Sequence, residues 1–128
     1  MAYVELTKEN FEEVITSNDT VVVDYWADWC GPCKSFGPIF EKVSEDFPDA
    51  VFAKVDTQNE QEIASWFLIR SIPTLMIFRE KVMVFSQPGA LPEGALREVV
   101  TKAKDLDMVE VHKQVAEQQA AKEKQADK

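Results

Sequence analysis

The sequence predicts an α/β protein: a central, mostly parallel five-stranded sheet with helices on both faces and an antiparallel hairpin at one edge. Segments with strand-like and helix-like patterns alternate through residues 4–67, which is typical of parallel strands joined by crossover helices. Two further strand-like segments are separated by only two residues, too few for a crossover helix, so they must pair as a hairpin. The chain has 128 residues, which fits one domain with a single core.

The first half of the chain alternates three strands with three helices. Thr7 is a suitable N-cap for the first helix, which continues to about Ser17. Segment 20–27 is β-branched and aromatic, and both of its alternating faces are apolar, as expected of a central strand covered by helices. In order, we expect a strand at 4–6, a helix from the Thr7 cap to 17, a strand at 20–27, a helix at 33–47, a strand at 50–56 and a short helix at 60–67.

The second half adds the hairpin and a closing helix. Strands at 74–79 and 82–86 form the hairpin at the edge of the sheet. After a turn at Pro88-Gly89, a helix at 92–103 completes the core.

The chain divides into a folded domain at 1–105 and a charged extension at 106–128. The extension is rich in Ala, Gln, Glu and Lys, a composition that favours helix locally but supports no core. We expect a protruding or frayed helix exposed to solvent, since isolated helices are marginal in water. Its few apolar residues leave a second interpretation open, in which the extension docks a partner.

Composition and charge exclude several classes of function. The formal net charge is −9, and no stretch of Lys and Arg is dense enough to bind nucleic acid or an anionic membrane. No apolar stretch approaches the roughly 20 residues that span a bilayer. Residues 1–13 carry charged side chains where a signal peptide needs an unbroken apolar segment. We expect a monomeric cytoplasmic protein without nucleic-acid or membrane partners.

The two cysteines, Cys30 and Cys33, are the first candidates for chemistry. In a reducing compartment, a pair at this spacing is more often catalytic or metal-binding than structural. Cys30 follows a buried strand and opens a helix, where unsatisfied N–H groups and the helix dipole stabilise a thiolate, the attacking form. Cys33 lies one turn along the same side, close enough for a disulfide. The pair is predicted to open and close as a redox centre.

A zinc site is the competing interpretation of this cysteine spacing. Structural zinc needs about four ligands. The sequence has no second cysteine pair, and its one histidine, His112, lies far away in the extension. We therefore expect no metal, and we assign His112 no role.

Asp24 is the next candidate, because its strand position is expected to bury it. With a period of two it shares a face with Val22 and Trp26, which a helix should cover. Burying an unpartnered carboxylate is costly, so desolvation should raise the pKa of Asp24 and suit it to act as a base behind the cysteines. Lys54, on the neighbouring strand, is a candidate charge partner. In the alternative interpretation, Asp24 caps a turn or faces solvent.

Pro73 stands at the entry to the strand at 74–79. A proline at this position cannot donate to the strand ladder. From the residues alone an ordinary trans bond is the commoner state, since only about 5% of X-Pro bonds are cis.

The chain from about residue 3 to 104 resembles the bacterial thioredoxin family, and the match is colinear over most of the chain rather than confined to one motif. The residues that carry it are Val23-Asp24-Tyr25-Trp26-Ala27, Trp29-Cys30-Gly31-Pro32-Cys33-Lys34, Pro38, Ala53-Lys54-Val55-Asp56, Ile69-Arg70, Ile72-Pro73-Thr74, Phe78 and Gly89-Ala90. The resemblance implies a thioredoxin fold for the domain at 1–105 and a protein-disulfide reductase activity.

The same resemblance implies roles for individual residues. Cys30 would attack a client disulfide, and Cys33 would resolve the mixed disulfide that forms. Asp24, with Lys54 nearby, would assist proton transfer at Cys33. Pro73 would be the family's cis-proline beside the pair, and would leave the neighbouring backbone free for strand-like pairing with a client. The implied docking patch consists of Trp29, Gly31, Pro32, Ile72, Pro73 and Gly89.

The family also implies a recycling partner besides the disulfide-containing clients. This partner is a separate flavin-containing thioredoxin reductase supplied with electrons by NADPH. The chain itself has no Gly-x-Gly-x-x-Gly motif and nothing that resembles a nucleotide-binding loop. We therefore expect no bound cofactor, and the redox-active group is the Cys30–Cys33 disulfide.

Three positions depart from the family pattern. Ser71 stands where the family usually has glycine, and Glu80-Lys81 replaces an Asn-Gly-like hairpin turn. Pro88 stiffens a loop on the docking side. We expect these changes to affect the range of clients and not the reaction.

Two other functions stay open. A disulfide oxidase or isomerase would use the same cysteines in a different direction, although Gly31-Pro32 and the expected lack of an export signal favour the reductant. A thiol-independent binding or chaperone-like module would use only the apolar patch. Such a module has no need of an oxidisable pair beside a buried acid.

Overall fold

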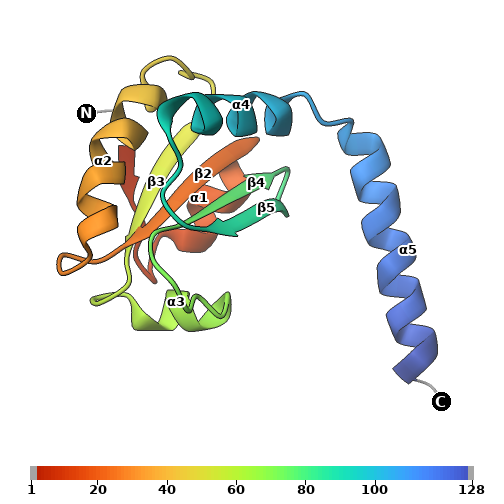
Figure 1. Ribbon diagram of the computed structural model, residues 1–128. Helices are drawn as coiled ribbons and strands as arrows, with labels where there is room; N and C mark the ends of the chain where they lie inside the picture. Colours follow the sequence, from red (N-terminus) through yellow and green to blue (C-terminus); the bar gives the residue numbers. More distant parts are fainter. Residues whose placement is uncertain (1–2, 127–128) are drawn as a thin grey trace.

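The computed structural model describes residues 3–126, which form a five-stranded sheet between helices (Figure 1). In spatial order β1-β3-β2-β4-β5, the strands are β1 (Tyr3–Glu5), β3 (Val51–Asp56), β2 (Thr20–Trp26), β4 (Thr74–Arg79) and β5 (Val82–Pro88). β3 pairs parallel with β1 and β2, whereas β4 pairs antiparallel with β2 and β5. Only β4 is reversed among the described strands, so the mostly parallel sheet with its edge hairpin is confirmed.

Helices cover both faces of this sheet, as the sequence predicted. The helices are α1 (Phe11–Ser17), α2 (Gly31–Ser44), α3 (Gln61–Trp66), α4 (Glu93–Lys104) and α5 (Met108–Ala126). Residues of α1 and α3 belong to one buried cluster, and residues of α2 and α4 belong to a second. The sheet therefore lies between two helical layers, while α5 stands apart from both (Figure 1).

Strand β2 explains how the two clusters are built. Val21, Val23 and Tyr25 pack on the side of α1 and α3, and Val22 packs on the side of α2 and α4. All four side chains are fully buried. Asp24 comes two residues after Val22 and therefore shares its face of the strand, so its carboxyl lies on the face that α2 and α4 cover.

The first helix begins later than the sequence predicted. It starts at Phe11, because Thr7 and Asn10 form a turn in place of a helical cap. The Thr7 N–H donates to Asn10 Oδ1 at 2.7 Å, and the Asn10 N–H donates to Thr7 Oγ1 at 3.3 Å. The predicted cap at Thr7 is therefore wrong, and Asn10 is the N-cap residue.

Helix α2 is shifted toward the cysteines relative to the prediction. It begins at Gly31, with Cys30 as its N-cap, and ends at Ser44. The predicted end at Phe47 is wrong; this residue precedes Pro48, and a residue before proline is disfavoured in the helical conformation.

Helix α5 has 19 residues and projects away from the sheet (Figure 1). Met108 at its start is buried, whereas Val109 is 82% exposed. Next to the domain, His112 Nε2 lies 3.0 Å from Glu80 Oε1, in the turn between β4 and β5. The expected protruding helix is confirmed.

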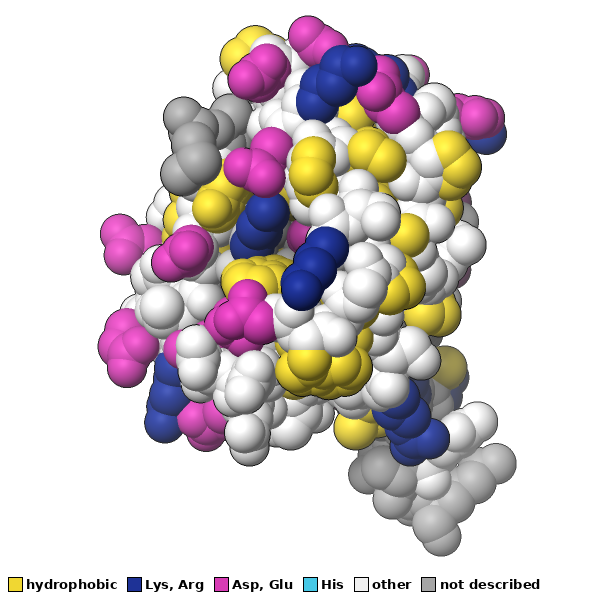
Figure 2. All heavy atoms as spheres, turned by 60° about the vertical axis from the view of Figure 1, so that its left-hand side comes forward, with side chains coloured by type: hydrophobic (Ala, Val, Ile, Leu, Met, Phe, Trp, Pro, Cys, Tyr) yellow, Lys and Arg dark blue, Asp and Glu magenta, His cyan; other side chains and the backbone are white. Residues whose placement is uncertain are grey.

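The side of the molecule that carries α2 has mixed charge. Acidic side chains are spread over this face, and basic ones lie singly or beside acidic ones (Figure 2). Lys42 of α2 pairs with Glu93 of α4 at 3.0 Å, and Arg97 of α4 pairs with Asp46 at 2.7 Å. Exposed pairs of this kind contribute little to stability, so the apolar cluster beneath the two helices holds them in place.

Within the described chain, no helix is both long and apolar enough to cross a membrane.

Candidate active site

Cys30 and Cys33 lie at the point where the chain leaves β2 and enters α2. Their sulfurs form a disulfide, with the two Cα atoms 5.3 Å apart, inside the usual range. The Cys33 N–H donates to Cys30 Sγ at 3.2 Å, so this sulfur occupies the place of the usual capping oxygen. In the reduced protein, the same N–H group and the helix dipole stabilise a thiolate at Cys30.

The loop before β4 lies against the disulfide. The peptide bond between Ile72 and Pro73 is cis, the geometry that the family resemblance implied. Cys30 Sγ is 3.6 Å from the carbonyl oxygen of Ile72. The Gly89 N–H donates to the carbonyl of Pro73 at 2.8 Å, and the φ of Gly89 is +105°, a conformation that residues with a Cβ rarely adopt. The structure thus brings Cys30, Ile72, Pro73 and Gly89 together.

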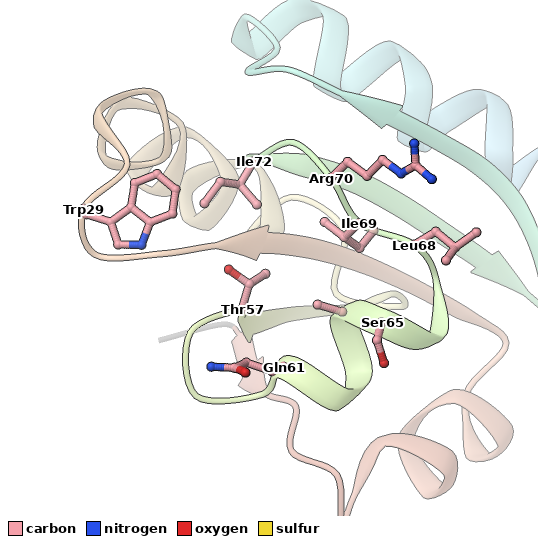
Figure 3. A pocket seen from close by; sticks show the side chains of 9 residues that line it. Trp29, Thr57, Gln61, Ser65, Leu68, Ile69, Arg70 and Ile72 are labelled. Carbon is pink, nitrogen blue, oxygen red and sulfur yellow. The ribbon is translucent and has the colours of Figure 1, made fainter.

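An open cavity of about 480 Å³ begins near the disulfide and continues along α3 (Figure 3). Trp29, which is 71% exposed, lies at one end, and Leu68 lies at the other. Of the predicted docking residues, Trp29 and Ile72 line this cavity, while Gly31 and Pro32 are exposed beside Cys30. The complete lining is Trp29, Thr57, Gln61, Ala64, Ser65, Leu68, Ile69, Arg70 and Ile72.

Sequence reasoning missed the part of the cavity beyond Trp29 and Ile72. Leu68 is 72% exposed and has a φ of +53°, a left-handed conformation that costs about 1 kcal/mol for a residue other than glycine. The available signal was the unbroken apolar run Trp66–Ile69 at the end of a short helix. Such a run is longer than an inward-facing stripe requires, so some of its members had to face solvent.

Asp24 is buried as the strand pattern predicted, with 1% of its surface exposed. Its Oδ1 atom has no hydrogen-bond partner in the described part of the chain. Burial raises the pKa of the Asp24 carboxyl from 3.8 to about 7. The Lys54 ammonium opposes this rise in pKa, and the Glu41 carboxylate adds to it. The carboxyl therefore gains or loses its proton near neutral pH.

Lys54 is the neighbour of Asp24 in the β2–β3 register, but its ammonium group is bound elsewhere. Lys54 Nζ pairs with Glu41 Oε2 of α2 at 3.3 Å and lies 4.4 Å from the ring centroid of Tyr3. The predicted partnership with Asp24 is thus an attraction through space and not a contact. Glu41 was missed by sequence reasoning; the signal is its position one helical turn after Gly37, on the side of α2 that faces β3.

A second cavity of about 290 Å³ connects these charges to the disulfide. Asp24, Lys54 and Glu41 line it together with Cys33. Cys33 therefore has access to the buried carboxyl through the same space, while Cys30 does not line this cavity.

Comparison with known proteins decides the family. Residues 2–102 match the family model described as Thioredoxin. The chain belongs to the thioredoxin family. It is 62% identical over 117 residues to a putative thioredoxin 2 from Streptomyces coelicolor, across 91% of this chain and 87% of the relative. A thioredoxin from Mycoplasmoides gallisepticum is 43% identical over 93 residues, across 73% of this chain and 93% of the relative.

Solved thioredoxin structures have the same fold. A mutant thioredoxin from Halobacterium salinarum superposes with a TM-score of 0.75 at 33% identity, across 80% of this chain and 91% of the other. Plasmodium falciparum thioredoxin gives a TM-score of 0.73 at 33% identity, across 77% of this chain and 97% of the other.

Family membership and the cysteine pair together identify a thiol–disulfide oxidoreductase with a reductase function, as the sequence predicted. Thioredoxins act on disulfide-containing clients, and the disulfide at the start of α2 supplies the redox group. Among residues 3–126, no group of three or more His, Cys, Asp or Glu side chains could hold a metal ion. His112 lies on α5 beside Glu80, outside the site.

Proposed function

We propose that Cys30 is the nucleophile of the reductase and carries out the first step. Its thiolate attacks one sulfur of a client disulfide, which breaks the client bond and forms a mixed disulfide. The released client sulfur leaves as a thiolate and takes a proton from solvent. The support for this role is the position of Cys30 as N-cap of α2, where the Cys33 N–H points at its sulfur.

In the second step, Cys33 resolves the mixed disulfide. Asp24, as a carboxylate, takes the thiol proton of Cys33 by way of their shared cavity, and Lys54 stabilises the carboxylate from a distance. The Cys33 thiolate then attacks Cys30 Sγ, forms the internal disulfide and releases the second client sulfur, which is protonated. In total, two electrons pass from the protein to the client. Each of the two client sulfurs takes up one proton from solvent, and Asp24 returns the Cys33 proton to solvent.

The client docks on the patch around the disulfide. Trp29, Gly31 and Pro32 supply exposed surface beside Cys30. The cis geometry at Pro73 presents the backbone of Ile72 next to the reacting sulfur, where an extended client segment is able to pair with it. Gly89 closes the patch through its bond to Pro73.

The oxidised protein is returned to the dithiol by a thioredoxin reductase, a flavoprotein that takes electrons from NADPH. We assign the protein to the cytoplasm as a monomer with no bound cofactor. Its redox domain spans 1–105 and its helical extension spans 106–128; residues 1–2 and 127–128 lie outside those that the structure describes.

The observation that carries this function is a disulfide at a helix N-terminus, 3.6 Å from the cis-proline loop. The test is reduction of insulin disulfides in the presence of NADPH and a bacterial thioredoxin reductase. We expect steady turnover by the native protein and none by Cys30→Ser. If the native protein fails with the reductase, dithiothreitol replaces it as electron donor. Failure there as well contradicts the reductase function and favours the thiol-independent binding module. Turnover that survives Cys30→Ser contradicts Cys30 as the nucleophile.

A further inference from the structure

The ammonium group of Lys54 is held by contacts that turn it away from Asp24. Its side chain is 13% exposed, so its position is defined by packing. Glu41 binds it at 3.3 Å from α2, and the ring of Tyr3 lies 4.4 Å away on the side of β1. Gly37 of α2 lies beside this group, since a Cβ at residue 37 would be at an ordinary van der Waals distance of 3.6 Å from Nζ.

Asp24 is left without the partner that its neighbour offers. Lys54 and Asp24 are directly paired in the register of two adjacent strands, and both line the same cavity. Even so, Asp24 Oδ1 has no hydrogen-bond partner among the described residues. A buried carboxylate normally recruits any cation within reach, so something must outcompete it for Lys54. Glu41 is 36% exposed and less desolvated, which makes it the more favourable partner.

We propose that Glu41 is a positioning residue that holds the Lys54 ammonium away from Asp24 and thereby sets the pH range in which Cys33 resolves the mixed disulfide. This inference rests on the proposed function, in which Asp24 takes the proton of Cys33. Glu41 itself touches neither sulfur. It acts by deciding which of two carboxylates the lysine binds.

Other charged groups also face this cavity. Glu5 of β1, Asp28 of the loop before the disulfide and Lys34 of α2 line it with Asp24, Lys54 and Glu41. Glu5, Asp28 and Lys34 are exposed, so solvent screens their effect on Asp24 more strongly than that of Lys54. Tyr3 contributes its ring to the same wall.

The first test is Glu41→Gln. Removing the carboxylate frees Lys54 to move toward Asp24 and removes a negative charge from its surroundings, and both effects favour ionised Asp24. We expect the Asp24 titration, followed by carboxyl ¹³C NMR, to move down by about 1 pH unit. The rate of mixed-disulfide resolution, followed in single turnovers by tryptophan fluorescence, should rise several-fold near pH 6 and stay unchanged well above pH 8.

Two further variants isolate the route of the effect. Glu45→Gln removes the same charge from the end of α2, but Glu45 is exposed and does not line the cavity. This control variant should therefore leave the pH at which Asp24 titrates unchanged. In a Lys54→Gln background, Glu41→Gln should move the Asp24 titration much less than in the native protein, because the cation that Glu41 holds is gone.

The outcomes separate this proposal from the proposed function. An unmoved Asp24 titration in Glu41→Gln, an equal shift in Glu45→Gln, or a full shift in the Lys54→Gln background each overturns the positioning role. If Glu41→Gln moves the Asp24 titration but not the pH dependence of mixed-disulfide resolution, the link between Glu41 and the Cys33 step is overturned. That result would show that Asp24 is not the base that takes the Cys33 proton. Insulin reduction by the native protein, measured alongside, shows independently whether the reductase function stands.

Discussion

The two cysteines have the same exposed fraction, 4%, but entirely different surroundings. Cys30 is next to the exposed ring of Trp29 and 3.6 Å from the backbone of Ile72, in the part of the site that a partner is able to reach. Cys33 instead lines the cavity of Asp24 and Lys54 beneath α2. In the proposed mechanism, the Cys30–Cys33 disulfide therefore lies between the surface that recognises the client and the buried space in which the proton is transferred.

This difference follows from where α2 begins. Because Cys30 is the N-cap and Cys33 lies in the first turn, the helix directs one sulfur toward the cis-proline loop and the other toward the sheet face that holds Asp24. A variant that affects only one of these surroundings should change only one half of the reaction.

The largest expected effect is on stability, in Asp24→Asn. The pKa of Asp24 is about 7 in the folded protein, and its ordinary value, which applies to the unfolded chain, is 3.8. At a pH between 3.8 and about 7, the folded state therefore holds a proton that the unfolded chain has released. Raising the pH through this range therefore favours unfolding, by about 4 kcal/mol in total. Asp24→Asn should lack this loss. The measurement is urea unfolding of the native protein and of Asp24→Asn, both oxidised, at pH 4 and pH 8.5. Subtracting the two free energies of unfolding at each pH cancels the contributions of the other carboxylates, which both proteins share.

The stability advantage of the variant should therefore grow with pH. A difference between the two proteins that stays constant from pH 4 to pH 8.5 would contradict the raised pKa of Asp24.

The second prediction concerns the rate of the Cys33 step in the same variant. Loss of a general base typically slows a step by about 10²-fold or more, so Asp24→Asn should resolve mixed disulfides slowly at pH 7–8 while forming them at the native rate. Rapid-quench trapping of the two steps checks this. Equal slowing of both steps would show that Asp24 does not serve Cys33 selectively.

The third prediction addresses the recognition side. Trp29→Ala removes a ring that is 71% exposed, so we expect unchanged stability but a KM for the reductase or for insulin that is raised about fivefold, equivalent to about 1 kcal/mol. The matched control is Val109→Ala, which shortens an exposed apolar side chain far from the disulfide, on α5. An effect of similar size in both variants would exclude a specific docking role for Trp29.

The smallest expected effect is at the far end of the larger cavity. Leu68→Gly relieves the φ of +53° and should stabilise the fold by about 0.5 kcal/mol, after allowing for the greater chain entropy of glycine. Leu68→Ala loses the side chain but keeps the Cβ, and should not be stabilised. Thermal unfolding of the two variants compares them directly, and equal melting temperatures would show that no backbone strain is stored at this residue.

Local patterns in the sequence were sufficient to predict the redox centre and the burial of Asp24. The period of two along β2 assigned Asp24 to a covered face, and the step from strand to helix placed Cys30 at a helix N-terminus. These features depend on neighbours in the sequence, so they were visible there. The turn at Thr7 shows the limit: Thr7 and Asn10 are both good caps, and only their mutual hydrogen bonds in the fold decide between them.

The contact between Glu41 and Lys54 could not be predicted in the same way. Strand order was enough to place Lys54 near Asp24, but the long lysine side chain reaches more than one carboxylate. Its choice depends on how α2 crosses β3, which places Glu41 Oε2 3.3 Å from Lys54 Nζ. The cavity beyond Ile72 is similar, because it is formed by α3 and the following loop together.

The difference between the two cysteines in their access to clients is tested most directly by trapping mixed disulfides. Cys33→Ser and Cys30→Ser are each mixed in reduced form with a peptide that contains one disulfide, and the adducts are identified by mass spectrometry. We predict a stable mixed disulfide through Cys30 in the Cys33→Ser variant and almost none in Cys30→Ser. Equally rapid adduct formation through Cys33 would show that both sulfurs are open to clients and would contradict the division of the site into two sides.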